Sequence, residues 1–473
     1  MNRAGFFLAV LAVLIAARFC HLDILWAEET LPLAAASQIE AGKTLYRDAW
    51  FDKPPLVADV YLLWGARAGW PLRLAGALYG VVVCGLLFLF ARDLWSEREA
   101  YWAAGLAAFF LIFDFPSAVT PLAADLLMLA PHVAAVYLVF RGKPFWSGAI
   151  AGVAFLVHTK GLFVLAACLI WSWQAWPLLL LGFAATNGLA AGWMASQGSL
   201  AAYIDQVWKW GWLYAGSTFL EHPVRNGLER TSGWLGFHAA LVIAAAWFWI
   251  RRENSLAWRF AAWAVISFGA VTLGWRFFPR YFFQLLPVLT LAAARGMVLL
   301  GAKRVIALAA LLVPLIRFGP RYVTLARGDR HWADIAMDQD SRTAALLMRG
   351  ATHPGDTLFV WGFRPEMFVY TGLPAGTRFL DCQPLTGVPA DRHLTQSQPV
   401  DQGQTAARRV ELAQSRPTFV LDGLSPLNPA LAMNGYPELR PWLENYQAIG
   451  RTRTYVIYRL LPLPAGGALP EKR

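Results

Sequence analysis

Ionisable side chains are concentrated in residues 23–56, directly after the first apolar run of the chain. This stretch contains the acidic pair Glu28 and Glu29, and later Asp52 and Lys53 in front of two prolines. Charged groups are costly beside hydrocarbon, so such a cluster next to a membrane span indicates a functional site. A desolvated carboxylate is a better general base, and a lysine ammonium suits a phosphate oxygen. We therefore expect a proton acceptor and an anion contact in this stretch.

A structural explanation competes with this functional one. Residues 27–41 have helical composition with apolar side chains at helical spacing, and Gly42 is suited to end the helix. Acids in the first turn of a helix complement its dipole, and a lysine near a bilayer can extend its ammonium into water. Neither effect explains why an acidic pair, a glycine and an Asp-Lys-Pro-Pro sequence occur together.

The composition indicates a membrane protein. Of 473 residues, 57% are hydrophobic, 23 are tryptophan, and the mean hydropathy is +0.43, which is too apolar for an ordinary soluble protein of this length. The formal net charge is +11. Much of it lies in short connections between apolar runs, where positive charge sets topology. We therefore expect membrane lipids as neighbours and no nucleic acid as a partner.

The apolar runs predict about eleven transmembrane helices, since a span needs roughly 20 mostly apolar residues. The predicted spans are residues 5–20, 72–91, 100–115, 119–140, 145–157, 161–175, 177–196, 234–250, 256–275, 281–297 and 298–316. The first run is read as an uncleaved span because no convincing cleavage site follows it.

Charge in the connections predicts the orientation. With the N-terminus in the cytoplasm, the cytoplasmic connections collect most of the Arg and Lys residues, as the positive-inside rule requires. The predicted transmembrane domain is residues 1–318, with outer loops at residues 21–71, which carry surface helices, and 197–233. Residues 319–473 are then outside the cytoplasm.

Residues 319–473 are more polar and mix acids with bases. Their pattern predicts helices at residues 341–350 and 405–413. Short buried strands are predicted at residues 357–361, 377–380, 418–421 and 455–460. The fold class is therefore a polytopic α-helical membrane protein with a small C-terminal extracytoplasmic α/β domain.

The first outer loop has a family resemblance. Two acids, Gly42, a Tyr-Arg-Asp sequence and the sequence Asp-Lys-Pro-Pro-Leu follow one another. This order resembles the GT-C glycosyltransferases, in particular the lipid A aminoarabinose transferases and the protein O-mannosyltransferase-like bacterial enzymes. The resemblance makes the first acid the catalytic base. Here that position holds Glu28 where the family has Asp, so the choice between Glu28 and Glu29 stays open.

The resemblance extends to further residues. It implies a carrier-phosphate contact for Lys53, Lys160, Arg280 and Tyr281. It also implies a metal-assisting or acceptor-orienting acid at Asp52 and at Asp125. Arg276 is a second cationic candidate, whereas His158, beside Lys160, is read as structural.

The resemblance implies a transferase of the bacterial inner membrane. Its donor would be a sugar on polyprenyl phosphate, and its acceptor a lipid, glycan or protein of the cell envelope, on the outer face. A divalent metal ion stays open as a cofactor. The alternatives are a transporter or flippase of lipid-linked saccharides, or a non-catalytic envelope-assembly protein. A transporter would place its ionisable residues at mid-membrane and show paired repeats.

Overall fold

The computed structural model describes residues 2–113, 115, 119–216, 222–251, 256–328, 332–388 and 403–462. Contacts divide the chain into two units. The first, here called the helical unit, comprises Met1–Pro32 and Asp52–His331. The second, the sheet unit, comprises Leu33–Phe51 and Trp332–Arg473.

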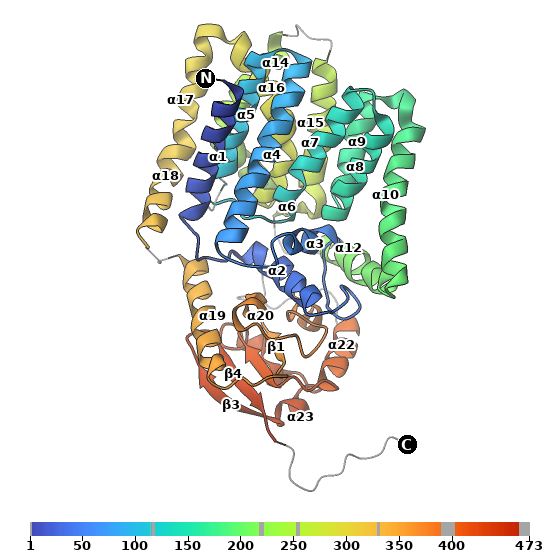
Figure 1. Cartoon of the computed structure of the whole chain (residues 1–473), viewed down its shortest axis with the longest axis vertical. Coiled ribbons are helices and arrows are strands. Elements are labelled where there is room, and N and C mark those ends of the chain that lie inside the picture. Colours follow the sequence, from blue (N-terminus) through green and yellow to red (C-terminus); the bar gives the residue numbers. More distant parts are fainter. Residues whose placement is uncertain are drawn as a thin grey trace. The chain divides into compact units, whose positions relative to one another are not determined.

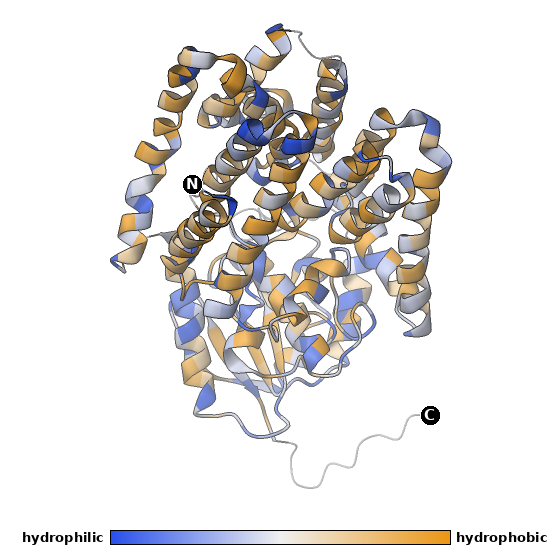
Figure 2. Cartoon of the chain, turned by 45° about the horizontal axis from the view of Figure 1, so that its top comes forward, coloured by the Kyte–Doolittle hydropathy of each residue, from blue (hydrophilic) through white to orange (hydrophobic). Residues whose placement is uncertain are grey.

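The helical unit consists of packed apolar helices (Figures 1 and 2). Its longer helices are α1 (Arg3–Phe19), α4 (Trp70–Leu94), α5 (Glu97–Ile112), α7 (Leu129–Phe140), α8 (Pro144–Val157), α9 (Gly161–Trp171), α10 (Trp176–Ser196), α13 (Pro223–Phe237), α14 (Ala239–Arg251), α15 (Ala257–Thr272), α16 (Leu286–Leu299) and α18 (Leu312–Ala326). Short elements join them: α3 (Leu56–Leu62), α6 (Ala124–Leu127), α11 (Leu200–Tyr203), the π-helical turn η2 (Ile204–Lys209), α12 (Trp210–Gly216), η4 (Pro279–Leu285) and α17 (Arg304–Ala310). Helix α2 (Ala27–Glu40) begins in the helical unit and ends in the sheet unit.

The helical unit is that of a polytopic membrane protein. Among the described residues, four helices are long and apolar enough to cross a bilayer: Trp70–Leu94, Trp173–Ser196, Ala257–Trp275 and Pro279–Leu299. A fifth is formed if α13 and α14, bent by 89°, count as one span. Several shorter apolar helices pack beside them, and the total of about eleven spans stays a prediction.

Two predicted spans are wrong in position. The predicted span 234–250 crosses the bend between α13 and α14. The predicted span 298–316 crosses a break, because α16 ends at Leu299 and Gly301 has a φ of 53°. Helix α17 follows and ends at Ala310, and α18 continues to Ala326, so the predicted domain boundary at residue 318 lies inside α18.

Glycines bring α8 and α10 into backbone contact. A Cβ atom on Gly148 would lie 1.9 Å from the carbonyl oxygen of Leu179, and one on Gly182 would lie 2.0 Å from that of Phe145. Such close approach between helices is open to glycine alone. The two glycines therefore set the close packing of α8 against α10.

The sheet unit contains a four-stranded mixed sheet with the strand order β1-β2-β4-β3. The strands are β1 (Leu358–Trp361), β2 (Phe419–Asp422), β3 (Tyr446–Arg451) and β4 (Val456–Leu460). The first two are parallel and buried along their whole length. Helices α19 (Ala333–Arg349) and α22 (Gly403–Ala413) belong to the same unit.

Three of the four predicted strands are confirmed, at β1, β2 and β4. The strand predicted at residues 377–380 is wrong, since that segment forms bends with no ladder partner. Strand β3 was not predicted, because its side chains are mostly exposed and its sequence lacks a buried apolar run. Both predicted helices of this unit are found, and α19 begins eight residues earlier than expected.

Candidate functional site

The two glutamates lie in the first turn of α2, as predicted, and Gly42 follows this helix with a φ of 85°. Their side chains differ sharply in exposure. Glu29 is fully buried, whereas the side chain of Glu28 is 46% exposed. The expected desolvation therefore holds for Glu29 and not for Glu28.

Glu29 has its carboxylate oxygens engaged inside the helical unit. Arg73, in the first turns of α4, donates to both of them, at 2.8 and 2.9 Å. The backbone N–H of Trp26 donates at 3.3 Å and that of Leu122 at 2.9 Å. A carboxylate with a bidentate guanidinium and two N–H donors is a structural anchor and has little capacity left for a substrate proton.

The anchor extends to the segment in front of Asp125. Glu29 holds the N–H of Leu122, and the hydroxyl of Tyr61 donates to the carbonyl of the same residue. Both backbone groups of Leu122 are therefore fixed from other elements. This fixes the start of α6, on which Asp125 lies.

Glu28 forms an ion pair with Arg280, whose side chain is 16% exposed. Arg280 lies in η4, the tight helical turn that leads into α16. Residues separated by about 250 positions are thus joined at the surface of one site.

Lys160 lies in the link between α8 and α9 and is buried. Its ammonium is 2.9 Å from the ring centroid of Tyr281, a close cation–π contact. Among the described residues, no acceptor forms a hydrogen bond with this ammonium. Burial lowers the pKa of Lys160 to about 7, although Asp125 acts in the opposite direction.

His158 connects Lys160 to Asp125. The backbone N–H of Lys160 donates to Nδ1 of His158 at 3.1 Å, so Nδ1 carries no proton. Burial, and then Lys160 and Lys53, hold the pKa of His158 well below its usual value, so the ring is neutral. Its proton is therefore on Nε2, which faces Oδ1 of Asp125 at 3.6 Å.

Lys53 and Asp52 form an ion pair of 3.3 Å just before α3. Burial acts to lower the pKa of Lys53, but Asp52, Tyr214 and Asp125 raise it above its usual value. The ammonium is therefore charged at neutral pH.

The electrostatic centre of the site is Asp125. Its carboxylate interacts with Lys160, Arg280 and Lys53, and also with Glu28. The predicted residues thus come together in the helical unit from four separate parts of the chain, with Glu29 behind them as the anchor. The three cations are matched in formal charge by Asp125, Asp52 and Glu28, so an anionic ligand would share cations that these acids also contact.

Residues that the sequence reasoning missed or underrated complete the site. Arg73 was not singled out, because an arginine at the start of an apolar helix resembles a topology signal. His158 was read as structural, although its spacing from Lys160 is the one available signal. Arg276 donates to the carbonyl of Tyr214 at 2.6 Å and lies 3.5 Å from the centroid of its ring, so it supports α12.

The acids do not form a metal centre. Within the ranges described above, no group of three or more His, Cys, Asp or Glu side chains is placed to hold an ion. Asp52 is paired with Lys53, and Asp125 is surrounded by cations. These donors do not fit a divalent ion, so no chemical step is derived through one.

Comparisons with known proteins bear on the fold of the chain. Residues 52–191 match the family model described as dolichyl-phosphate-mannose-protein mannosyltransferase. The crystal structure of ArnT from Cupriavidus metallidurans bound to undecaprenyl phosphate is similar over 97% of this chain and 98% of that one, with a TM-score of 0.58 and 14% identity. The chain has the GT-C fold. The resemblance inferred from the sequence is thereby confirmed.

Two further solved structures share the GT-C fold. ArnT from the same organism in the apo state gives a TM-score of 0.57 at 15% identity, over 97% of this chain and 98% of that one. The arabinofuranosyltransferase AftD from mycobacteria gives 0.52 at 16% identity, over 98% of this chain and 40% of that one. No curated protein sequence matches the chain.

Proposed function

We propose that the protein is a membrane glycosyltransferase that moves a sugar from a polyprenyl-phosphate donor to an envelope acceptor. The carrying observation is the convergence of Lys53, Lys160 and Arg280 around one acid, beside the half-exposed Glu28. The family model and the undecaprenyl phosphate bound to ArnT support this class of donor.

The cations have a defined task in this reaction. The bond between the anomeric carbon and the phosphate oxygen breaks, and the polyprenyl phosphate leaves with the bonding electron pair. Positive groups already in place stabilise that developing charge without reorganisation, which usually makes the largest contribution in such steps. Lys160 supports this task because its ammonium is buried without a hydrogen-bond acceptor among the described residues.

Glu28 is the proposed base. An acceptor hydroxyl or amine gives its proton to this carboxylate and attacks the anomeric carbon on the face opposite the phosphate, so the configuration inverts. Glu28 forms an ion pair with Arg280 but is half-exposed and can meet an acceptor, whereas Glu29 is buried and held by Arg73 and two backbone N–H groups. This difference in exposure supports Glu28 over Glu29 in the proposal.

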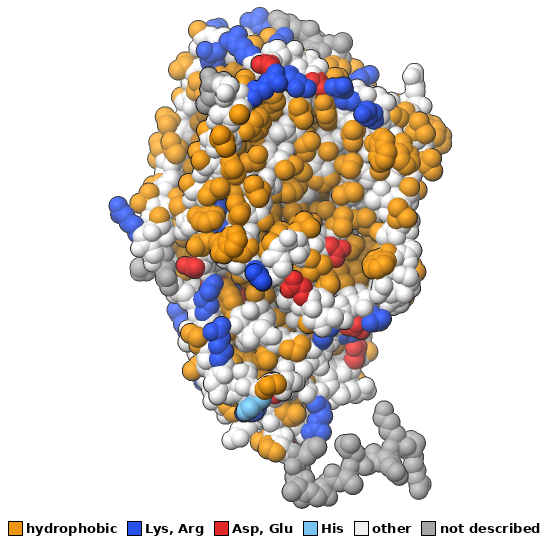
Figure 3. Space-filling model, viewed as in Figure 1, with side chains coloured by type: hydrophobic (Ala, Val, Ile, Leu, Met, Phe, Trp, Pro, Cys, Tyr) orange, Lys and Arg blue, Asp and Glu red, His pale blue; other side chains and the backbone are white. Residues whose placement is uncertain are grey.

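The proposed setting is the outer face of a bacterial inner membrane, with about eleven spans. Lys and Arg side chains gather at one end of the helical unit (Figure 3). Under the positive-inside rule this end is cytoplasmic. Helix α5 begins at the basic end. Asp125 follows the opposite end of α5, so the proposed site lies toward the outer face.

The test compares Glu28→Gln with Glu40→Gln in membranes supplied with a panel of undecaprenyl-phosphate-linked sugars. Glu40 is an exposed acid in the last turn of the same helix and serves as the matched control. We expect E28Q to slow sugar transfer by at least about 100-fold, the usual contribution of a general base. E40Q should transfer at the parent rate.

Binding of undecaprenyl phosphate separates the base from donor recognition. E28Q should retain the thermal shift that this lipid produces, and K160Q should lose most of it. Sugar transfer by E28Q at the parent rate would refute the assignment of Glu28 as the base. Carriage of the lipid-linked sugar across sealed vesicles with no transfer in any variant would replace the proposal with a transporter.

A further inference from the structure

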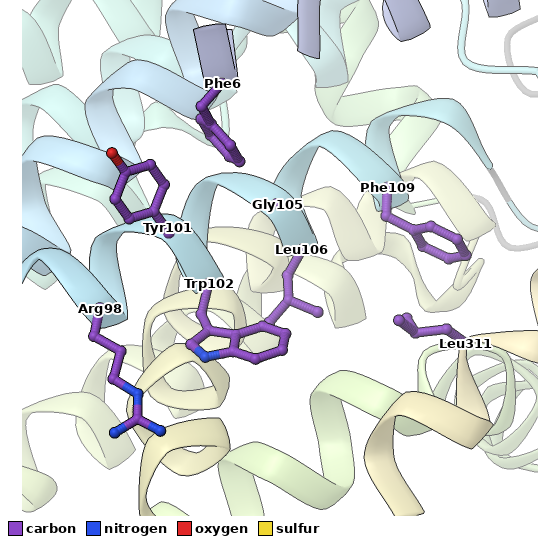
Figure 4. Close-up of a pocket in the computed structure, with 8 residues that line it drawn as sticks. All are labelled: Phe6, Arg98, Tyr101, Trp102, Gly105, Leu106, Phe109 and Leu311. Carbon is purple, nitrogen blue, oxygen red and sulfur yellow. The ribbon is translucent and has the colours of Figure 1, made fainter. Parts of the chain in front are cut away.

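An apolar groove opens on the side of the helical unit, away from the charged site. It has a volume of about 460 Å³. Figure 4 shows that its lining comes from α1, from one face of α5 and from the junction between α17 and α18. Its apolar lining includes Phe6, Trp102, Leu106, Phe109 and Leu311.

One end of this groove carries positive charge. Arg98, in the first turn of α5, lines the groove one helical turn before Trp102. The guanidinium of Arg304 lies 6.0 Å from the ring centroid of Trp102. One guanidinium group therefore lies beside the Trp102 indole, and the Arg98 side chain lines the groove one helical turn away.

The acids nearby are already occupied. Glu97 pairs with Arg3, and Glu99 pairs with Arg295 at 2.6 Å. Among the described residues, neither Arg98 nor Arg304 forms an ion pair. Their charge is therefore available to an anion from outside the protein.

We propose that this groove is a binding site for one anionic phospholipid of the bilayer. An acyl chain lies along the aromatic lining, and the phosphate is held by Arg98 and Arg304. Basic pockets between membrane helices recognise anionic headgroups in this way. Tryptophan side chains, which are amphipathic, are enriched at the headgroup level of the bilayer. This site is independent of the proposed transfer reaction.

Position separates this groove from the transfer site. Arg98 is at the start of α5, and Asp125 follows the other end of that helix, which spans 16 residues or about 24 Å. A carrier phosphate bound among Lys53, Lys160 and Arg280 does not reach the groove's charged end. The occupant is therefore a structural bilayer lipid.

Gly105 offers a steric probe of the groove. It lines the groove, and a Cβ atom there would meet no heavy atom within 4 Å. A leucine at this position fills space meant for the acyl chain and also suits a helix better than glycine. G105L should therefore fold and exclude the lipid.

The experiment measures lipid retained by the purified full chain in detergent, by native mass spectrometry with added phosphatidylglycerol or phosphatidylcholine. The parent protein should retain about tenfold more phosphatidylglycerol than phosphatidylcholine. The double variant R98Q/R304Q should lose that preference, and G105L should lose retention altogether. The control is K143Q/R251Q, which removes the same charge from exposed residues outside the groove lining.

Each result decides the proposal. Loss of preference in R98Q/R304Q and of retention in G105L, with the control unchanged, establishes the site. An equal loss in the control would mean that a general basic belt attracts the lipid. Undiminished retention in G105L would show that the lipid binds elsewhere. Stronger retention of undecaprenyl phosphate than of phosphatidylglycerol would show that the carrier, and not a bilayer phospholipid, occupies the groove.

Discussion

At the residue scale, Glu28 and Glu29 show how adjacent identical side chains take opposite tasks. At the start of α2 the side chain of Glu28 is half-exposed, whereas Glu29 and the next residue, Thr30, are both buried. Glu29 faces inward and meets Arg73. Glu28 is left at the surface, where it meets Arg280 and, in the proposed reaction, the acceptor.

Replacing Glu29 by Gln should destabilise the protein. The substitution leaves the buried guanidinium of Arg73 without its counter-charge, a change that costs about 3–5 kcal/mol in comparable buried pairs. We expect a markedly lower unfolding temperature for E29Q in detergent and little change for E28Q. Equal stabilities of the two variants would contradict the anchor role of Glu29.

Lys160 should make donor binding depend on pH. Its pKa is lowered to about 7 by burial, against the opposing effect of Asp125, so the ammonium is lost as pH rises through that value. Because the charged form binds phosphate, kcat/KM for the donor should fall above about pH 7. K160R keeps its charge at all these pH values. A fall of the same size in K160R would assign the pH dependence to another group.

At the element scale, the site depends on short irregular pieces between helices. Asp125 is at the start of α6, Lys160 is between α8 and α9, and Arg280 is in η4. Each piece is held by its neighbours, as when Glu29 and Tyr61 fix Leu122. The helices therefore act as supports, and the proposed site residues lie at or between the helix ends.

The protein should not tolerate even an alanine at position 148. A methyl group there would overlap the backbone of α10, so G148A forces α8 and α10 apart. We expect a loss of about 1–3 kcal/mol in stability, as for overpacked cores, and weaker donor binding because Lys160 follows α8. Gly188 is the control, since it lies exposed on α10 with nothing within 4 Å of a Cβ.

The corresponding variant, G188A, should be neutral or slightly stabilising, because alanine favours a helix over glycine. Unfolding temperature and undecaprenyl phosphate affinity are measured for both variants. If G148A proved as stable as G188A, the close contact between α8 and α10 would be refuted.

At the scale of the whole molecule, the proposed orientation puts the sheet unit outside the cytoplasm. Single cysteines in a Cys20→Ala background test this orientation, since the other three native cysteines are buried. A cysteine in place of the exposed Arg440 should react with an impermeant maleimide in intact cells. A cysteine in place of the exposed Lys143 should react only after the cells are opened. The reverse pattern would invert the topology.

Local sequence signals determine the fold class and many of the secondary-structure elements of this protein. Apolar runs, the glycine that ends α2 and the β-branched strands are local signals, because burial and backbone preference act over a few residues. They predicted the polytopic helical class, α2 and three of the strands. They placed two spans wrongly, since a bend at α13–α14 and a break near Gly301 reflect packing.

Tertiary structure decided how the charged residues divide their work. Both glutamates looked equal along the chain, and only the place of Arg73 and Leu122 on other elements made Glu29 an anchor. The partners of Lys160, namely Tyr281 and His158, likewise depend on which helix ends meet. Electrostatic and hydrogen-bond partners are set by distance in space, and no sequence spacing encodes a meeting between residues 28 and 280.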